Sequence, residues 1–137
     1  MYLIDTNVVS ELRKGNRGNV GVREFWQQVE PATLFVSVVT IGELRRGVDN
    51  LRARDDLPQA QQLENWLNNV LIDYTDRILD FDRECAQMWG KLMSPHPQHA
   101  IDKQIAAIAL IHDLTVVTRN TADFVGTGAK LLNPFSA

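Results

Sequence analysis

The sequence predicts an α/β domain of three layers, in which a central parallel sheet of about five strands is flanked by helices. Short β-type apolar segments alternate with longer segments of helical period, as in βαβ units. The clearest of these segments, LTVVT at residues 114–118, has the composition of a buried parallel strand covered on both faces. A chain of 137 residues, 45% of them hydrophobic, suits one core. We therefore expect a single domain spanning residues 1–137.

The first half of the chain contains two expected strands and four expected helices. Residues 2–4 form the first strand, and residues 8–13 begin a helix. Apolar residues then recur at i, i+3, i+4 and i+7 over residues 22–29, until Pro31 ends this second helix. The next strand covers residues 34–38. After it we expect a helical hairpin made by residues 41–51 and 59–71.

The second half of the chain repeats this order. Residues 77–81 form the third expected strand, and Asp82 is the natural N-cap of a helix that runs to Met93. The segment 94–97, Ser-Pro-His-Pro, then breaks the chain. An apolar helix, a buried strand and a short final strand follow it at residues 101–112, 114–118 and 130–132.

Composition favours a soluble protein of a reducing compartment. The only cysteine, Cys85, lies in an apolar helical segment, so neither a disulfide framework nor a zinc motif is expected. His96, His99 and His112 lack the partners of a triad or metal site, and we interpret them as surface or helix-end residues. The N-terminus lacks the features of a signal peptide and no segment is long enough to span a membrane, so we expect a cytoplasmic protein.

Four acidic residues occupy positions where α/β proteins commonly carry their binding and catalytic residues. In a parallel sheet, ligands bind at the carboxyl ends of the strands. Asp5 ends the first strand, Glu43 follows the second, and Asp123 follows the strand at 114–118. Asp102 opens the helix that leads into that same strand. Right-handed crossovers can bring all four to one edge of the sheet.

Such a cluster needs a positive partner. Two carboxylates about 4 Å apart repel by roughly 4 kcal/mol at an effective dielectric constant near 20. Oxygen ligands favour Mg²⁺ or Mn²⁺, and these ions hold phosphate oxygens and activate a bound water. Phosphodiester hydrolysis suits this chemistry. The net charge of −3 argues against nucleic acid binding, but without the four acids the rest of the chain is slightly positive.

Each acid also has a structural explanation. Asp5 can cap the helix that follows the first strand. Thr40 and Glu43 have the spacing of a capping box. Asp102 suits the first turn of a helix, and Asp123 suits a turn. Taken singly, these explanations compete with a functional one, so the prediction of a site depends on the joint placement of the four residues.

The segments that hold these acids resemble the PIN-domain family, especially the VapC-type toxins of type II toxin–antitoxin systems. The matching segments, in order, are LIDTNVVSEL, SVVTIGELRRG, AIDKQIAAIAL, and LTVVTRNTADF with a closing LLNP. The resemblance implies a PIN-like fold and an endoribonuclease, a hydrolase that uses Mg²⁺, with Mn²⁺ as the alternative ion. It implies catalytic roles for Asp5, Glu43, Asp102 and Asp123, with Asp5 and Asp102 as the principal metal ligands. It places supporting polar groups at Thr6, Asn7, Thr118 and Asn120.

The resemblance also implies partners. Such toxins are usually neutralised by a small antitoxin whose C-terminal segment blocks the acidic pocket, and we expect a homodimer and a toxin–antitoxin hetero-oligomer. Trp66 is our candidate for the groove that receives the antitoxin, with core packing as the alternative. Arg45 and Arg46, downstream of Glu43, can contact RNA phosphates or form a solvated helix face. Two other functions stay open, a non-catalytic RNA-binding relative and a receiver-like phosphoacceptor domain.

Overall fold

The computed structural model describes residues 1–137 and confirms the predicted α/β fold. All strand pairs are parallel, and the five strands lie in the order β3-β2-β1-β4-β5. The strands are β1 (Tyr2–Ile4), β2 (Leu34–Ser37), β3 (Ile78–Leu79), β4 (Thr115–Val117) and β5 (Lys130–Leu132). The helices are α1 (Thr6–Leu12), α2 (Val20–Gln28), α3 (Val38–Ala53), α4 (Leu57–Asp73), α5 (Arg83–Met93) and α6 (Ala100–His112). Short 3₁₀ turns are η1 (Gly15–Arg17), η2 (Pro31–Thr33) and η3 (Thr121–Phe124).

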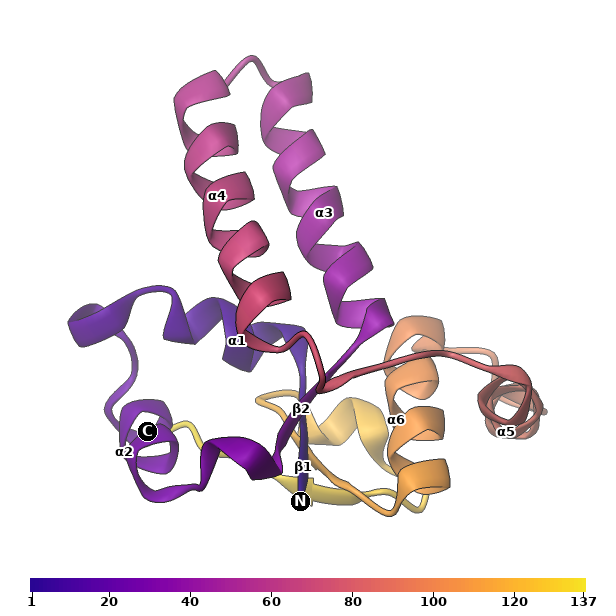
Figure 1. Cartoon of the computed structure of the whole chain (residues 1–137). Coiled ribbons are helices and arrows are strands. Elements are labelled where there is room, and N and C mark those ends of the chain that lie inside the picture. The colour runs from indigo at the N-terminus through magenta and orange to yellow at the C-terminus, as the bar shows by residue number, and fades with distance from the viewer.

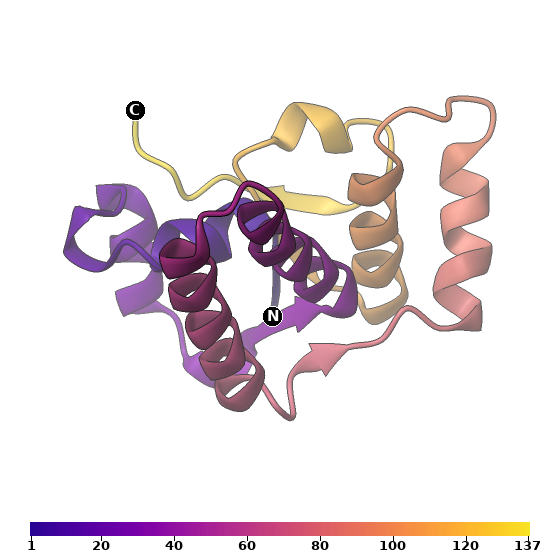
Figure 2. The ribbon, with the colours of Figure 1, turned by 90° about the horizontal axis from the view of Figure 1, so that it is seen from above.

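The central strands carry a core on each face of the sheet. Successive strand residues point to opposite faces, so Ile4 and Val117 pack with α1 to α4, whereas Leu3 and Val116 pack with α5, α6 and η3. Figures 1 and 2 show α5 and α6 on the opposite side of the sheet from α1 and α2. Cys85 is fully buried in the second core, as its apolar surroundings in the sequence indicate.

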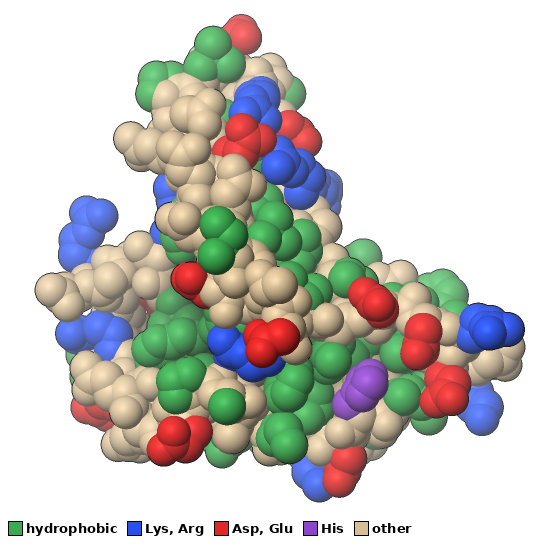
Figure 3. Space-filling model, viewed as in Figure 1, with side chains coloured by type: hydrophobic (Ala, Val, Ile, Leu, Met, Phe, Trp, Pro, Cys, Tyr) green, Lys and Arg blue, Asp and Glu red, His purple; other side chains and the backbone are tan.

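The predicted helical hairpin is confirmed. Helices α3 and α4 lie side by side and rise away from the sheet (Figure 1). Apolar residues of both helices, among them Val48 and Leu67, are buried in the first core. On their exposed side, Arg45 and Arg52 of α3 both pair with Glu64 of α4, at 2.5 and 2.7 Å. Basic and acidic side chains accordingly lie next to each other along the hairpin in Figure 3.

Two predicted boundaries are wrong. Helix α3 begins at Val38, because the Ser37 hydroxyl accepts a hydrogen bond from the backbone N–H of Thr40 at 3.1 Å and caps the helix there. Thr40 and Glu43 therefore lie inside the helix and do not form the expected capping box. Strand β3 has two residues and not five. Arg77, just before it, contacts β2 through its backbone carbonyl, which accepts from the backbone N–H of Val36 at 3.0 Å, and its side chain donates to the carbonyls of Pro31, Leu34 and Asp73.

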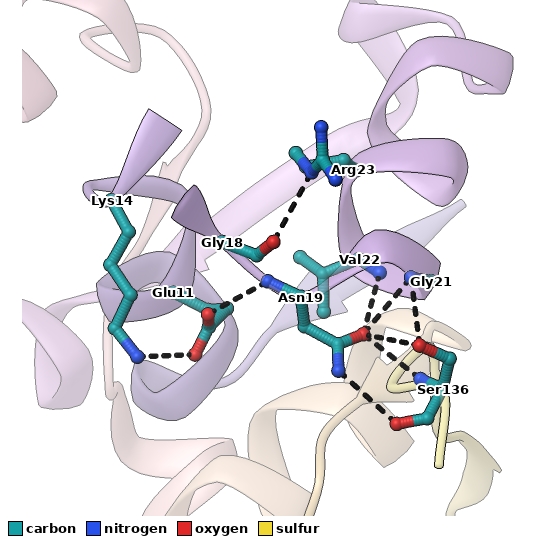
Figure 4. A network of polar contacts seen from close by, with 8 residues as sticks. All are labelled: Glu11, Lys14, Gly18, Asn19, Gly21, Val22, Arg23 and Ser136. Carbon is teal, nitrogen blue, oxygen red and sulfur yellow. Dashed lines mark hydrogen bonds and ion pairs between the residues drawn. The ribbon is translucent and has the colours of Figure 1, made fainter. Parts of the chain in front are cut away.

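The C-terminal segment is fastened to the start of α2 through Asn19 (Figure 4). The Asn19 carboxamide oxygen accepts hydrogen bonds from the backbone N–H groups of Gly21 and Ser136, at 3.0 and 2.9 Å. The backbone N–H of Asn19 in turn donates to the Glu11 carboxylate at 2.9 Å, which links this network to α1. None of the helices combines the length and apolar content needed to cross a membrane.

Gly21 is the position where this attachment is most sensitive. A Cβ atom there would lie 2.3 Å from the carbonyl oxygen of Pro134 and 2.6 Å from the backbone nitrogen of Ser136. We expect Gly21→Ala to displace the C-terminal segment and to lower the free energy of unfolding by about 1–2 kcal/mol. Gly90→Ala is the matched control, because Gly90 lies within α5 with open space around it. Gly90→Ala should stabilise the protein slightly. Urea denaturation measures the free energy of unfolding of both variants. Equal effects of the two substitutions would show that the close approach of the C-terminal segment to Gly21 does not matter.

Candidate active site at the carboxyl edge of the sheet

The site lies where the strand order reverses. From β1 the sheet continues to β2 on one side and to β4 on the other, which makes the carboxyl ends of β1 and β4 the topological switch point. Asp5 directly follows β1, and Thr118 directly follows β4. The backbone N–H of Asp5 donates to the carbonyl of Val117 at 2.9 Å, so the two strand ends are held together.

Asp5 is the most enclosed of the four acids, with only 3% of its surface exposed. One carboxylate oxygen accepts a hydrogen bond from the backbone N–H of Thr6 at 2.8 Å. The other accepts from the Thr118 hydroxyl at 2.8 Å and from the Asn7 carboxamide at 3.3 Å. Asp5 is also the N-cap residue of α1, so its structural role exists alongside its place in the site. These donors fix the direction in which the carboxylate points.

The polar residues that the resemblance singled out surround Asp5 unequally. The Asn7 carboxamide oxygen accepts from the backbone N–H of Arg119 at 3.1 Å, and its nitrogen also lies 3.3 Å from the Thr118 hydroxyl. Asn120 joins this network through its backbone N–H, which donates to the Thr118 hydroxyl at 3.0 Å. The exposed Asn120 side chain makes no hydrogen bond that caps η3. Thr118 is therefore the centre of the network that joins the two strand ends.

Glu43 reaches the site from the second turn of α3. Its carboxylate accepts a hydrogen bond from the Thr6 hydroxyl, which also lies 3.1 Å from the hydroxyl of Thr40. Thr40 is fully buried, and sequence reasoning considered it only as a capping residue. Burial, with the negative charge of Asp5, raises the pKa of Glu43 above its ordinary value, while the Thr6 hydrogen bond and Arg46 oppose this shift.

Asp102 and Asp123 complete the cluster. Asp102 lies in the first turn of α6, as the sequence indicates. Asp123 lies in the 3₁₀ turn η3, which agrees with its expected place in a turn. Burial raises the pKa of Asp102 to about 6, and the negative charges of Asp5, Asp123 and Glu43 contribute to the increase. Burial also raises the pKa of Asp5, with a smaller contribution from Asp123. The structure therefore brings all four acids into one electrostatically coupled group.

Two residues of the site were not expected. His99 precedes α6, and its Nε2 atom lies 3.8 Å from a carboxylate oxygen of Asp123. The expectation that this histidine lacks partners is wrong; its position three residues before Asp102 was the available signal. Lys103, next to Asp102, has 8% of its surface exposed, and its ammonium donates to the carbonyl of His96. It thereby holds the loop that carries His99.

The two arginines proposed for RNA contact have different surroundings. Arg45 is engaged with Glu64 in the hairpin, at 2.5 Å. Arg46 is exposed, and its positive charge acts on Glu43. Of the two, Arg46 is the one whose charge is directed at the acidic cluster.

The donor set of the site fits a hard divalent cation. Carboxylate oxygens dominate it. Burial is the largest cause of the raised pKa values of Asp5, Glu43 and Asp102, and repulsion among the acids adds to it. A divalent cation would relieve that repulsion and restore the ionised form of the acids. Asp102 and Asp123 place carboxylate oxygens within 4.8 Å of each other, and the charges of Asp5 and Glu43 act on Asp102.

The burial of Asp102, with the nearby negative charges, predicts how pH affects the metal-free protein. Because the pKa of Asp102 rises from 3.8 to about 6 on folding, stability is lost as the pH increases through that interval. Asp102→Asn removes this loss and should stabilise the protein at neutral pH by about 1 kcal/mol. A shift of two pKa units would correspond to roughly 3 kcal/mol, but solvent screens the partly exposed side chain and reduces the effect. Thermal denaturation in EDTA at neutral pH and below pH 4 measures this; a variant less stable than the wild type at neutral pH would contradict it.

Known proteins are similar to this chain in both sequence and fold. A family model described as PIN domain matches residues 2–128. Toxin FitB from Neisseria gonorrhoeae is 32% identical, with 98% of this chain and 99% of that protein covered. VapC ribonuclease Y4jK from Sinorhizobium fredii is 31% identical, with 98% of both chains covered. The crystal structure of FitAcB from Neisseria gonorrhoeae matches with a TM-score of 0.85 and 32% identity, covering 98% of each chain.

Proposed function

The chain belongs to the PIN domain family, and from this premise we propose that it is a divalent-metal-dependent endoribonuclease acting as the toxin of a toxin–antitoxin pair. The observation that carries the proposal is the coupled cluster of Asp5, Glu43, Asp102 and Asp123 at the switch point of the sheet. A ribonuclease relative and a toxin relative both align along almost the whole chain, which supports the same function. We also propose a cytoplasmic location, where RNA is available as a substrate.

Asp5 and Asp102 are the proposed principal ligands of the ion, with Glu43 and Asp123 completing the acidic site. Mg²⁺ is the proposed ion and Mn²⁺ an alternative, because both prefer oxygen donors. When bound, such an ion would neutralise the carboxylates, hold phosphate oxygens and lower the pKa of a water at the scissile phosphodiester.

The residues of the chain have their own tasks in this function. The hydrogen bonds from Thr6, Asn7 and Thr118 keep the Asp5 carboxylate in one orientation, so little reorganisation is needed when the substrate arrives. The Thr6 hydroxyl holds Glu43 in the same way. Arg46 is free of ion pairs and is the proposed contact for an RNA phosphate, since a guanidinium offers several donors to phosphate oxygens.

We further propose that a small antitoxin blocks the acidic site. A guanidinium or ammonium group of the partner would relieve the same repulsion as the ion. Apolar side chains of the partner would enter a cavity of about 350 Å³ between α1, α2 and α4, whose lining includes Leu12, Trp26 and Trp66. The position of Trp66 in this lining supports its assignment to a groove, and a homodimer within a larger toxin–antitoxin assembly is the proposed oligomeric form.

The function is tested with purified protein and a defined RNA. We expect internal cleavage in Mg²⁺ or Mn²⁺ and none in excess EDTA, with activity restored when the ion is returned. Asp49→Asn is a suitable control, because Asp49 is an exposed acid on α3 that pairs with Arg52 away from the cluster. It should cleave like the wild type. Undiminished cleavage in EDTA would exclude metal dependence, and RNA binding without cleavage under either ion would favour a non-catalytic relative.

A further inference from the structure

His99 lies among the acids in a geometry that a metal ion can use. One ligand atom each from His99, Asp102 and Asp123 lie within 4.8 Å of one another. Ligands at about 2.1 Å from a single octahedral ion are separated by about 3–4.2 Å. The His99–Asp123 distance of 3.8 Å already falls in this range. Only small side-chain movements would therefore place all three groups around one ion.

The backbone holds His99 in this place. It occupies the N-cap position of α6 with a φ angle of 57°, in the left-handed region, where few residues other than glycine are found. Its carbonyl accepts the first hydrogen bond of the helix, from the backbone N–H of Lys103 at 2.9 Å. The Trp89 indole donates to the carbonyl of Ala100 at 3.0 Å, and the Lys103 ammonium binds the carbonyl of His96. The loop is thus fixed on both sides of His99.

A capping role does not explain the imidazole. An N-cap side chain normally accepts a hydrogen bond from a backbone N–H of the first turn. His99 makes no such bond, and its ring is directed toward Asp123 instead. The ring also lines, with Asp123, a polar cavity of about 430 Å³ beside the acidic cluster, so the site is accessible to ions from solvent.

We propose that His99 is a metal ligand, which with Asp102 and Asp123 makes a mixed nitrogen and oxygen site that favours a first-row transition-metal dication over Mg²⁺. Imidazole is a good ligand for transition metals, whereas Mg²⁺ prefers an all-oxygen shell and retains several waters. His99 would therefore determine which ion is preferred. Asp102 would belong both to this site and to the acidic cluster that contains Asp5. This inference rests on the proposed metal-dependent function, and it changes the preferred ion of that function from Mg²⁺ to Mn²⁺.

The test uses the full chain and Mn²⁺ as the probe. His99→Asn removes the imidazole and retains a residue type that tolerates the left-handed conformation. The matched control is His112→Asn at the other end of α6, roughly 20 Å along the helix axis. Electron spin echo envelope modulation of bound Mn²⁺ detects a directly coordinated imidazole nitrogen. Mn²⁺ and Mg²⁺ affinities are measured in parallel by titration and competition.

We expect nitrogen modulation in the wild type and in His112→Asn, and its loss in His99→Asn. The Mn²⁺ affinity of His99→Asn should fall about 10-fold while its Mg²⁺ affinity changes less than about twofold. Mn²⁺ bound without nitrogen modulation, or an unchanged ratio of the two affinities, would overturn the ligand role and leave the proposed ribonuclease intact. A wild-type chain that binds neither ion would overturn both.

Discussion

Asp5→Asn should reduce RNA cleavage by about 10²-fold or more while the protein remains folded. The substitution keeps the shape of the side chain but removes a negative charge that an ion would contact. It also disturbs the surrounding hydrogen bonds, because the Asp5 oxygens accept from Thr6, Asn7 and Thr118 and an amide offers only one oxygen acceptor. Single-turnover cleavage of a defined RNA, with circular dichroism to establish folding, measures the effect.

The control for Asp5→Asn is Thr118→Ser, which retains the hydroxyl that donates to Asp5. It should keep most of the activity, since the orientation of the carboxylate is preserved. Cleavage by Asp5→Asn at more than a tenth of the wild-type rate would contradict the role assigned to Asp5.

Phe124→Ala should produce the largest loss of stability among the residues that support the site. Phe124 is 1% exposed and packs in the core formed by β1, β4 and α6. Removal of a buried aromatic ring costs about 3–5 kcal/mol. Because Phe124 adjoins Asp123 within η3, the substitution should also weaken divalent-ion binding. Urea denaturation measures the first effect and calorimetric titration the second.

Val125→Ala is the control for Phe124→Ala. Val125 is the next residue in the chain and is 77% exposed, so its truncation should change stability by less than about 0.5 kcal/mol. A loss below about 1 kcal/mol for Phe124→Ala would show that η3 does not depend on this ring. The claim that Phe124 helps to position Asp123 would then be wrong.

The fold was predictable because its first four strands are short, mostly apolar segments separated by helical segments. The error at the start of α3 depends on which of two nearby hydroxyl groups caps the helix. Ser37 caps α3 in preference to Thr40, which has the same chemistry and lies three residues later. Arg77 uses its side chain to bind carbonyls across the fold, a contact that no local pattern predicts.

The candidate cluster was predictable where its residues follow strands, as Asp5 and Asp123 do, whereas Thr118 was indicated only by the resemblance to the PIN-domain family. His99 and Lys103 were missed because their roles depend on an irregular loop whose path the sequence does not specify. Lys103 in particular is a buried lysine that stabilises this loop through the carbonyl of His96, a contact visible only in three dimensions. The hydrogen bond between the Thr6 and Thr40 hydroxyls likewise depends on the contact between α1 and α3.

The most direct test of the central proposal is to sequence new RNA 5′ ends in cells that express this chain or its Asp5→Asn variant. A ribonuclease whose acidic cluster performs the cleavage should create new ends at defined RNA positions with the wild type. The same positions should stay uncut with Asp5→Asn at equal protein level. Identical new ends with both proteins, or none with either, would contradict the proposal that Asp5 and its neighbouring acids form a ribonuclease site.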